Sequence, residues 1–296
     1  MRRLIRTGVV LAVLGGVVAW FLTRPTPLDP AVIAGREGDA AHGALVFAAA
    51  GCASCHTAPD SEPTDMPVLS GGRAFPSDFG SFIAPNISPD PAAGIGGWSD
   101  YDLANAIMRG VSPAGAHYYP AFPYTAYAKA DPQDIVDLIA HLRSLPASDV
   151  ASQPHDVGFP FNIRRSLGGW KLLFASDAWV LAGEQTAEVT RGRYLVEALG
   201  HCGECHTPRN ALGGLQRGQW LAGAPHPGGE GTIPNITAGE LAWSEGEIVE
   251  YLTSGFTPDF DTAGGEMVDV IANTSRLPES DRAAIAAYLK AVPAVE

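Results

Sequence analysis

The sequence predicts an all-α protein in which two tandem copies of one helical domain follow an N-terminal transmembrane helix. An apolar run without any charge extends from Thr7 to Leu22. A set of short motifs occurs twice in the same order, once in each half of the chain. Helix-capping patterns stand at matching places in both copies, and no sustained alternation of apolar and polar residues predicts a strand.

The length supports a division into two domains. The chain has 296 residues, and a domain usually takes roughly 100–200 residues. We expect an N-terminal segment at 1–24, a first domain at 36–147 and a second domain at 189–296. The segment 148–188 between them is too apolar for a free tether, so we expect it to pack across both domains.

The net charge of −13 excludes some classes of function. Nucleic acid is not expected as a partner, because phosphate binding needs a basic face. An acidic surface serves either solubility or docking of a basic protein. The sequence contains no nucleophile triad, phosphate loop or dinucleotide motif.

The N-terminus has the pattern of an export signal. Arg2, Arg3 and Arg6 precede the apolar run, which is close to the ~17–25 residues of a membrane span. Basic residues before the run place the N-terminus in the cytoplasm and the rest outside. Because no small-x-small cleavage site follows, an uncleaved anchor is favoured over a cleaved signal peptide. We therefore expect an inner-membrane protein whose domains lie on the periplasmic side.

The repeated module centres on paired cysteines. One copy has Cys52-Ala53-Ser54-Cys55-His56 and the other has Cys202-Gly203-Glu204-Cys205-His206. The flanking motifs correspond as well: Gly43-Ala44-Leu45-Val46-Phe47 with Gly192-Arg193-Tyr194-Leu195-Val196, Pro85-Asn86-Ile87-Ser88 with Pro234-Asn235-Ile236-Thr237, and Trp98-Ser99 with Trp243-Ser244. Ser99 and Ser244 begin capping boxes, and Gly110 and Gly255 stand where those helices should end.

The pattern C-x-x-C-H is the attachment signal for c-type haem. Residues three apart share a helix face, so both thiols can form thioethers to one porphyrin edge. The adjacent His then binds the iron from one side. The sequence therefore predicts two covalently bound haem c groups, on Cys52, Cys55 and His56 and on Cys202, Cys205 and His206.

Three alternatives compete with haem. Two disulfides explain four cysteines in an exported protein but not the His after each pair. A zinc site lacks a second ligand pair near either motif. A redox-active C-x-x-C needs a thioredoxin-like context, which the sequence does not contain.

The sixth iron ligand decides between electron transfer and substrate chemistry, because an open iron position admits substrate. Met267 follows a Gly-Gly-Glu loop in the second module and is the predicted ligand there. His117 lies as far after His56 as Met267 lies after His206, and we predict it as the ligand of the first iron. Met66, Met108 and a five-coordinate iron remain alternatives for that position.

These motifs resemble the di-haem and multi-haem cytochrome c subunits of membrane-bound dehydrogenases that oxidise alcohols and sugar acids. The likeness covers nearly the whole chain after the anchor and implies two tandem cytochrome c domains. It rests on the two C-x-x-C-H motifs, Gly71-Gly72-Arg73, Pro85-Asn86-Ile87, Tyr119-Pro120-Ala121-Phe122-Pro123-Tyr124 and Gly265-Glu266-Met267. In many relatives an axial Met stands at the position of Phe122, which cannot bind iron.

The resemblance implies a non-catalytic electron carrier. Such subunits accept electrons from a dehydrogenase partner and deliver them toward quinone, an oxidase or a soluble cytochrome. A di-haem peroxidase is the alternative, because it also has two C-x-x-C-H modules; it would need an openable iron and nearby acid–base groups. A tethered shuttle without a fixed partner is the third interpretation.

Overall fold

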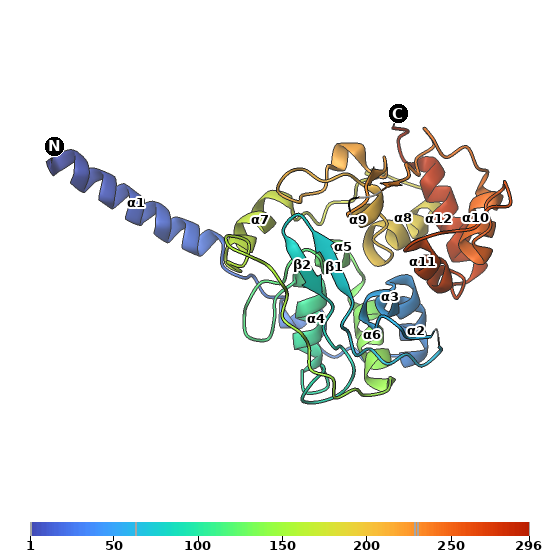
Figure 1. The fold of residues 1–296 in the computed structure, drawn as a ribbon, viewed down its shortest axis with the longest axis horizontal. Coiled ribbons are helices and arrows are strands. Elements are labelled where there is room, and N and C mark those ends of the chain that lie inside the picture. The colour runs from blue at the N-terminus through green and yellow to red at the C-terminus, as the bar shows by residue number, and fades with distance from the viewer. Residues whose placement is uncertain (1, 63, 228, 230, 296) are drawn as a thin grey trace.

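A computed structural model describes residues 2–62, 64–227, 229 and 231–295. Helices dominate these residues, and the strands form only two small antiparallel pairs (Figure 1). The α-helices are α1 (Arg2–Leu22), α2 (Ala40–Ala49), α3 (Cys52–His56), α4 (Asp100–Arg109), α5 (Tyr124–Tyr127), α6 (Pro132–Ser144), α7 (Ser166–Phe174), α8 (Ala187–Tyr194), α9 (Gly203–His206), α10 (Glu245–Ser254), α11 (Met267–Thr274) and α12 (Glu279–Ala291). Short 3-10 helices cover Pro30–Val32 and Arg217–Gln219, and a π-helical turn covers Leu195–Leu199.

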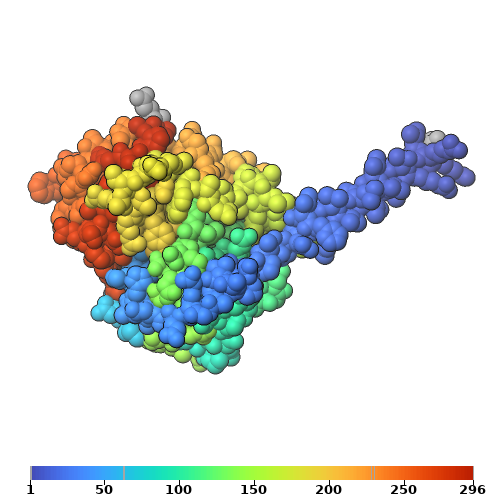
Figure 2. All heavy atoms as spheres, turned by 180° about the vertical axis from the view of Figure 1, so that it is seen from behind, coloured from blue at the N-terminus to red at the C-terminus, as the bar shows by residue number. Residues whose placement is uncertain are grey.

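Helix α1 projects from the body of the molecule, and none of its residues is buried (Figures 1 and 2). It has 21 residues and is long and apolar enough to cross a membrane. The apolar side chains of such an unpartnered helix have a lower free energy in the hydrocarbon of a bilayer than in water.

The first half of the body is built on a close crossing of α2 and α6. Gly43 lies at this crossing, where a Cβ atom would be 2.0 Å from the carbonyl oxygen of Asp137. Ile135 and Ile139 of α6 are fully buried beside it. The two helix backbones approach this closely because Gly43 has no side chain.

The second half repeats this crossing with α8 and α12. Gly192 corresponds to Gly43 in the repeated motif, and a Cβ atom on it would be 1.9 Å from the carbonyl oxygen of Ala284. Tyr288 of α12 is fully buried at the same crossing. The two copies of the motif therefore perform the same packing task, which confirms the all-α tandem architecture.

The predicted helix ends are confirmed. Ser99 and Ser244 both form complete capping boxes at the starts of α4 and α10. Gly110 and Gly255 end these helices in the left-handed conformation, with φ of 58° and 80°. A glycine adopts this conformation without steric cost, so both helices end where the sequence indicated.

The four short strands were not predicted. β1 (Ala74–Ser77) pairs with β2 (Gly80–Ile83), and β3 (Ala224–Pro225) pairs with β4 (Thr232–Ile233). Four residues, or two, are too few to show an alternating pattern, and β1 and β3 each contain a proline. Both hairpins follow a cysteine motif, so the repeat extends to them.

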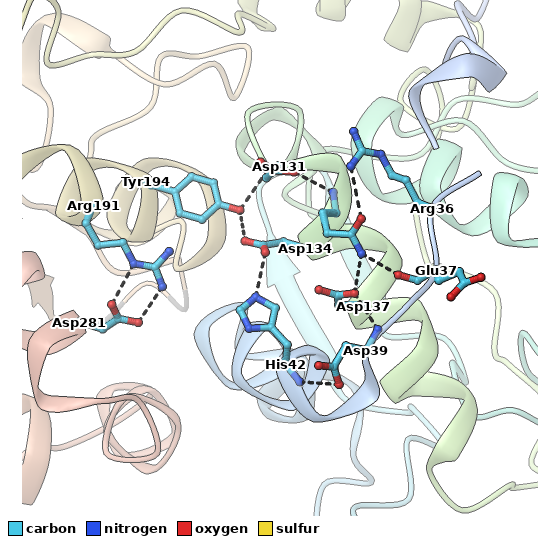
Figure 3. A network of polar contacts seen from close by, with 11 residues as sticks. Arg36, Glu37, Asp39, His42, Asp131, Asp134, Asp137, Arg191, Tyr194 and Asp281 are labelled. Carbon is cyan, nitrogen blue, oxygen red and sulfur yellow. Dashed lines mark hydrogen bonds and ion pairs between the residues drawn. The ribbon is translucent and has the colours of Figure 1, made fainter. Parts of the chain in front are cut away.

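A polar network joins the two halves (Figure 3). The hydroxyl of Tyr194 on α8 donates to Asp134 Oδ2 on α6 at 2.5 Å and accepts from the backbone N–H of Asp131. His42 Nε2 lies 3.0 Å from the other oxygen of Asp134. On the other side, Arg191 makes a two-point contact with Asp281. The network fixes α8 against the first half.

The segment 148–188 contacts both halves. Asp156 forms a β-bridge with Ser81 of the first half. Trp170 Nε1 donates to the carbonyl oxygen of Leu212 in the second half at 2.9 Å. The Glu197 carboxylate accepts hydrogen bonds from the backbone N–H groups of Val180 and Leu181. These bonds hold the segment on the body rather than leaving it as a free tether.

Candidate functional site

Each C-x-x-C-H motif forms a short helix that aims its histidine at a fixed carbonyl group. His56 Nδ1 lies 2.9 Å from the carbonyl oxygen of Pro85, and His206 Nδ1 lies 2.8 Å from that of Pro234. A carbonyl oxygen only accepts, so Nδ1 carries the proton in both rings. The lone pair of Nε2 is then directed away from the carbonyl and is available to a metal.

The protonation state of the two histidines also suits metal binding. Burial lowers the pKa of His56 and of His206, against the opposing effect of the carbonyl hydrogen bonds. Both rings are therefore neutral at neutral pH, and a neutral imidazole is the form that binds iron. The same orientation in both modules fits one axial histidine for each haem.

The asparagines after these prolines explain why the carbonyl groups are so well placed. Asn86 donates from Nδ2 to the carbonyl oxygens of Ser148 and Val150, both at 2.8 Å. Asn235 donates in the same way to the carbonyl oxygen of Val295 at 2.7 Å. The sequence showed the repeated Pro-Asn-Ile motif, but only the structure reveals that it orients the histidines.

The cysteines remain separate thiols in the structure. All four lie in the described part of the chain, and none forms a disulfide. Burial, reinforced by the neighbouring thiol of each motif, raises the pKa of Cys52 and of Cys202 to about 12. Zinc requires thiolates, and no group of three ligating side chains among the described residues includes a cysteine. Among the described residues, the cysteines are thus arranged neither as disulfides nor as part of a three-ligand metal group.

The two motifs lie against each other across the contact between the halves. His201, directly before Cys202, has its Nε2 3.3 Å from the carbonyl oxygen of Ala50, two residues before Cys52. The Tyr127 hydroxyl donates to the same oxygen at 3.2 Å, and its ring stands edge-on to His201 at 5.7 Å. The thiols are also close enough that Cys55 contributes to raising the pKa of Cys205.

His201 is a residue of the site that the sequence did not reveal. The ring is partly buried between the halves, and burial lowers its pKa. No pattern in the sequence marks the residue, because its partners Ala50 and Tyr127 are distant along the chain. Its position between the two motifs makes it part of the site.

Met267 is the first residue of α11 and is partly buried. The preceding residue, Glu266, is close enough to act on the second thiol pair. Burial first, and then the carboxylates of Glu204 and Glu266, raise the pKa of Cys205 to about 11. This proximity agrees with the predicted ligand role of Met267, which stays a prediction.

His117 is buried at the base of α1. Its Nε2 lies 2.9 Å from the carbonyl oxygen of Thr23, and its own carbonyl oxygen accepts from Arg164. Nδ1 has no hydrogen-bond partner among the described residues. Among the described residues, the backbone and side-chain contacts of His117 are with Thr23, Arg164 and Val111. As an iron ligand, His117 would use Nδ1 or release Thr23.

The other positions considered for the first iron differ in their surroundings. Met66 is exposed, and Met108 is buried in the hydrophobic core. Phe122 lies 6.0 Å from the ring of Tyr127, which contacts Ala50 beside the first motif. The position at which many relatives have an axial Met is thus occupied by an aromatic ring near the first motif.

Comparison with known proteins identifies the family of the two modules. The cytochrome c family matches residues 40–146 and 189–293. A diheme cytochrome c-type protein of Cereibacter sphaeroides is 57% identical over the full length of both chains. The fructose dehydrogenase cytochrome subunit of Gluconobacter japonicus is 36% identical over 92% of this chain and 56% of its own. The gluconate 2-dehydrogenase cytochrome c subunit of Pantoea cypripedii is 34% identical over 85% of this chain and 59% of its own.

The chain therefore spans little more than half the length of these dehydrogenase subunits, although it matches the Cereibacter protein from end to end. The relatives named here do not favour the peroxidase alternative. Haem c, when bound, supplies an iron that gains and loses one electron. Because both modules match the family and both carry a complete attachment motif, the chain belongs to the cytochrome c family as an electron-transfer protein with two covalently bound haem c groups.

Proposed function

We propose that this protein carries electrons from a membrane-associated dehydrogenase to the respiratory chain. The acceptor is an oxidase or a soluble cytochrome. Helix α1 anchors the chain in the inner membrane, and the domains at 36–147 and 189–296, joined by 148–188, lie on the periplasmic side. In this proposal the chain itself is not the catalytic subunit.

The contact between His201 and Ala50 carries this proposal. Ala50 lies two residues before Cys52 and His201 directly precedes Cys202, so their 3.3 Å contact brings the two attachment motifs near each other. Cys55 also acts electrostatically on Cys205 in the same region. Two haem groups attached at these neighbouring motifs would form a relay through which one electron at a time can cross the protein. The names of the relatives point to a dehydrogenase as the donor.

The site residues follow from the geometry and the repeat. Cys52 and Cys55 attach the first haem, and Cys202 and Cys205 attach the second. His56 and His206 bind the two irons on one side through Nε2, the nitrogen that their carbonyl hydrogen bonds leave available. On the other side, His117 is the proposed ligand of the first iron and Met267 that of the second.

Purification from native membranes tests the function. An affinity-tagged full chain, solubilised in mild detergent, should retain a dehydrogenase subunit. Its haem absorbance should change to the reduced spectrum on addition of that subunit's substrate, with fructose, gluconate and ethanol as the first candidates. The same chain freed of the partner by high salt is the control and should stay oxidised. Rapid turnover of peroxide by the isolated chain would instead support the peroxidase alternative.

A further inference from the structure

Helix α7 is fastened directly to the end of α1. The Arg165 guanidinium lies 4.2 Å above the ring of Trp20 and donates to Thr23 Oγ1 and to the carbonyl oxygen of Trp20. At Gly168, a Cβ atom would be 2.0 Å from the carbonyl oxygen of Thr23. The backbone of α7 therefore lies against Thr23, the residue that follows α1, and Figure 1 shows α7 beside the base of α1.

The body holds α7 in a fixed orientation. Leu167 and Gly168 are buried. Lys171 Nζ donates to the carbonyl oxygens of Arg109 and Gly110, at 2.6 and 2.9 Å, and so ties α7 to the end of α4. These contacts hold one face of α7 against the body and leave the opposite face exposed to the surroundings.

The outward face is strongly apolar. Leu172 is 61% exposed, Leu173 is 70% exposed, and Phe159 of the preceding loop is 82% exposed. These three residues are called the α7 patch below. Single exposed apolar residues are ordinary, but a group at the root of an apolar helix indicates an apolar neighbour.

The charge around the α7 patch differs from that of the chain as a whole. The chain has 32 acidic and 19 basic residues. Between Val157 and Ala175, however, it has Arg164, Arg165 and Lys171 and no acidic residue. Exposed Arg24 adds another positive charge at the end of α1. A local excess of positive charge next to exposed leucine and phenylalanine is typical of a surface that lies on anionic lipid.

We propose that the α7 patch is a second membrane contact, which rests in the interfacial layer of the same bilayer that α1 crosses. The inference depends on the proposed anchoring by α1. The occupant is lipid because α7, which carries Leu172 and Leu173, contacts Thr23 at the end of α1 through Gly168, so the bilayer surface is already within reach of the patch. Leu172, Leu173 and Phe159 enter the boundary between headgroups and acyl chains, and Arg24 and Arg165 meet the phosphates.

This second contact gives the anchor a fixed geometry. A single helix followed by a free tether would let the body rotate above the membrane. With α7 bound both to α1 and to lipid, the two haem motifs have a defined orientation toward the bilayer.

Photo-crosslinking to lipid tests the inference on the unmodified, haem-loaded full chain. The protein is placed in nanodiscs of phosphatidylethanolamine and phosphatidylglycerol, part of which carries a diazirine in the acyl chain. Adducts are expected on α1 and on the peptide that contains Leu172 and Leu173. Adducts on neither would overturn the anchoring by α1, and the inference with it. Adducts on α1 alone would overturn the α7 contact and leave the anchor intact.

A thiol-alkylation comparison provides a second readout. Leu173→Cys and Phe260→Cys replace side chains that are 70% and 92% exposed, so neither change disturbs the core. Phe260 lies on the loop between α10 and α11, and Figure 1 shows these two helices at the end of the body away from α1. In nanodiscs, a sulfonated maleimide should react with Cys at 173 about tenfold more slowly than at 260, since the thiolate reacts and an apolar surrounding disfavours it. Equal alkylation rates at positions 173 and 260 would contradict lipid contact. A slower rate at 173 that is seen only when a dehydrogenase is added would also contradict it.

Discussion

The side chain of Asn273 donates a hydrogen bond to Ser54 Oγ at 2.7 Å, although the two residues belong to opposite halves of the protein. Ser54 lies between the two cysteines of the first motif, and Asn273 lies on α11, the helix that begins at Met267. One turn earlier on the same helix, Asp269 pairs with Arg73 of the first half at 2.9 Å. The helix that carries the proposed ligand of the second iron is thus attached to the first haem motif.

The bond between Asn273 and Ser54 should contribute about 1 kcal/mol to the free energy of unfolding. We predict that the single variants Asn273→Ala and Ser54→Ala each lower this free energy and that the double variant loses less than their sum. A double-mutant cycle in denaturant measures the coupling. Strictly additive losses would show that the two side chains do not act on each other.

Removal of Met267 should affect only the second haem. We predict that Met267→Ala keeps both haems attached, because the cysteines are unchanged, but converts one of them from low spin to high spin and lowers its redox potential. Optical spectra and a redox titration measure both effects. Met66→Ala is the matched control, since Met66 is exposed and should leave both haems low spin. An unaltered spectrum in Met267→Ala would remove Met267 from the ligand set.

His117 can be tested for its two roles at once. With His117 as the ligand of the first iron, we predict that His117→Ala loses one low-spin signal while the haem whose proposed ligand is Met267 keeps its own. The variant also loses the hydrogen bond to Thr23 at the base of α1, for a cost of about 1 kcal/mol. Two intact low-spin signals combined with reduced stability would limit His117 to the contact with α1.

The contact between the halves should weaken in acid. Burial lowers the folded-state pKa of His201, so the folded protein binds fewer protons than the unfolded chain. Its stabilising contribution is therefore present above the unfolded pKa of about 6.5 and is lost as the pH falls below it. We predict that His201→Phe reduces the slope of unfolding free energy against pH below about 6.5. Denaturant titrations at several pH values measure the slope, and an unchanged slope would be the contrary result.

Replacement of the glycines at the two helix crossings should lower the free energy of unfolding. Gly43→Ala would place Cβ 2.0 Å from the Asp137 carbonyl oxygen, and forcing the helices apart should cost about 1–3 kcal/mol. Gly246→Ala on α10 is the matched control, because nothing beyond its chain neighbours and the adjacent backbone of its own helix lies within 4 Å of the added carbon. There alanine should be neutral or stabilise the helix by up to about 1 kcal/mol. Thermal unfolding followed by circular dichroism separates the two, and equal melting temperatures would contradict the packing argument.

Much of the architecture was predictable because its signals are local. Cys52–His56 and Cys202–His206 specify their chemistry within five residues, and Ser99, Ser244, Gly110 and Gly255 specify helix ends within one turn. The short strands escaped prediction because two to four residues carry no period. The burial of His201 escaped it because both partners lie far away in the sequence.

The sequence by itself determined the two C-x-x-C-H motifs, the tandem helical fold and the apolar N-terminal helix, because each rests on residues that are neighbours along the chain. Only the tertiary structure decided that the two motifs meet at His201, that His117 holds Thr23 and that α7 lies at the root of α1. These contacts join residues 151, 94 and 142 positions apart. Such pairs are brought together by the packing of whole helices, and no local pattern encodes that packing.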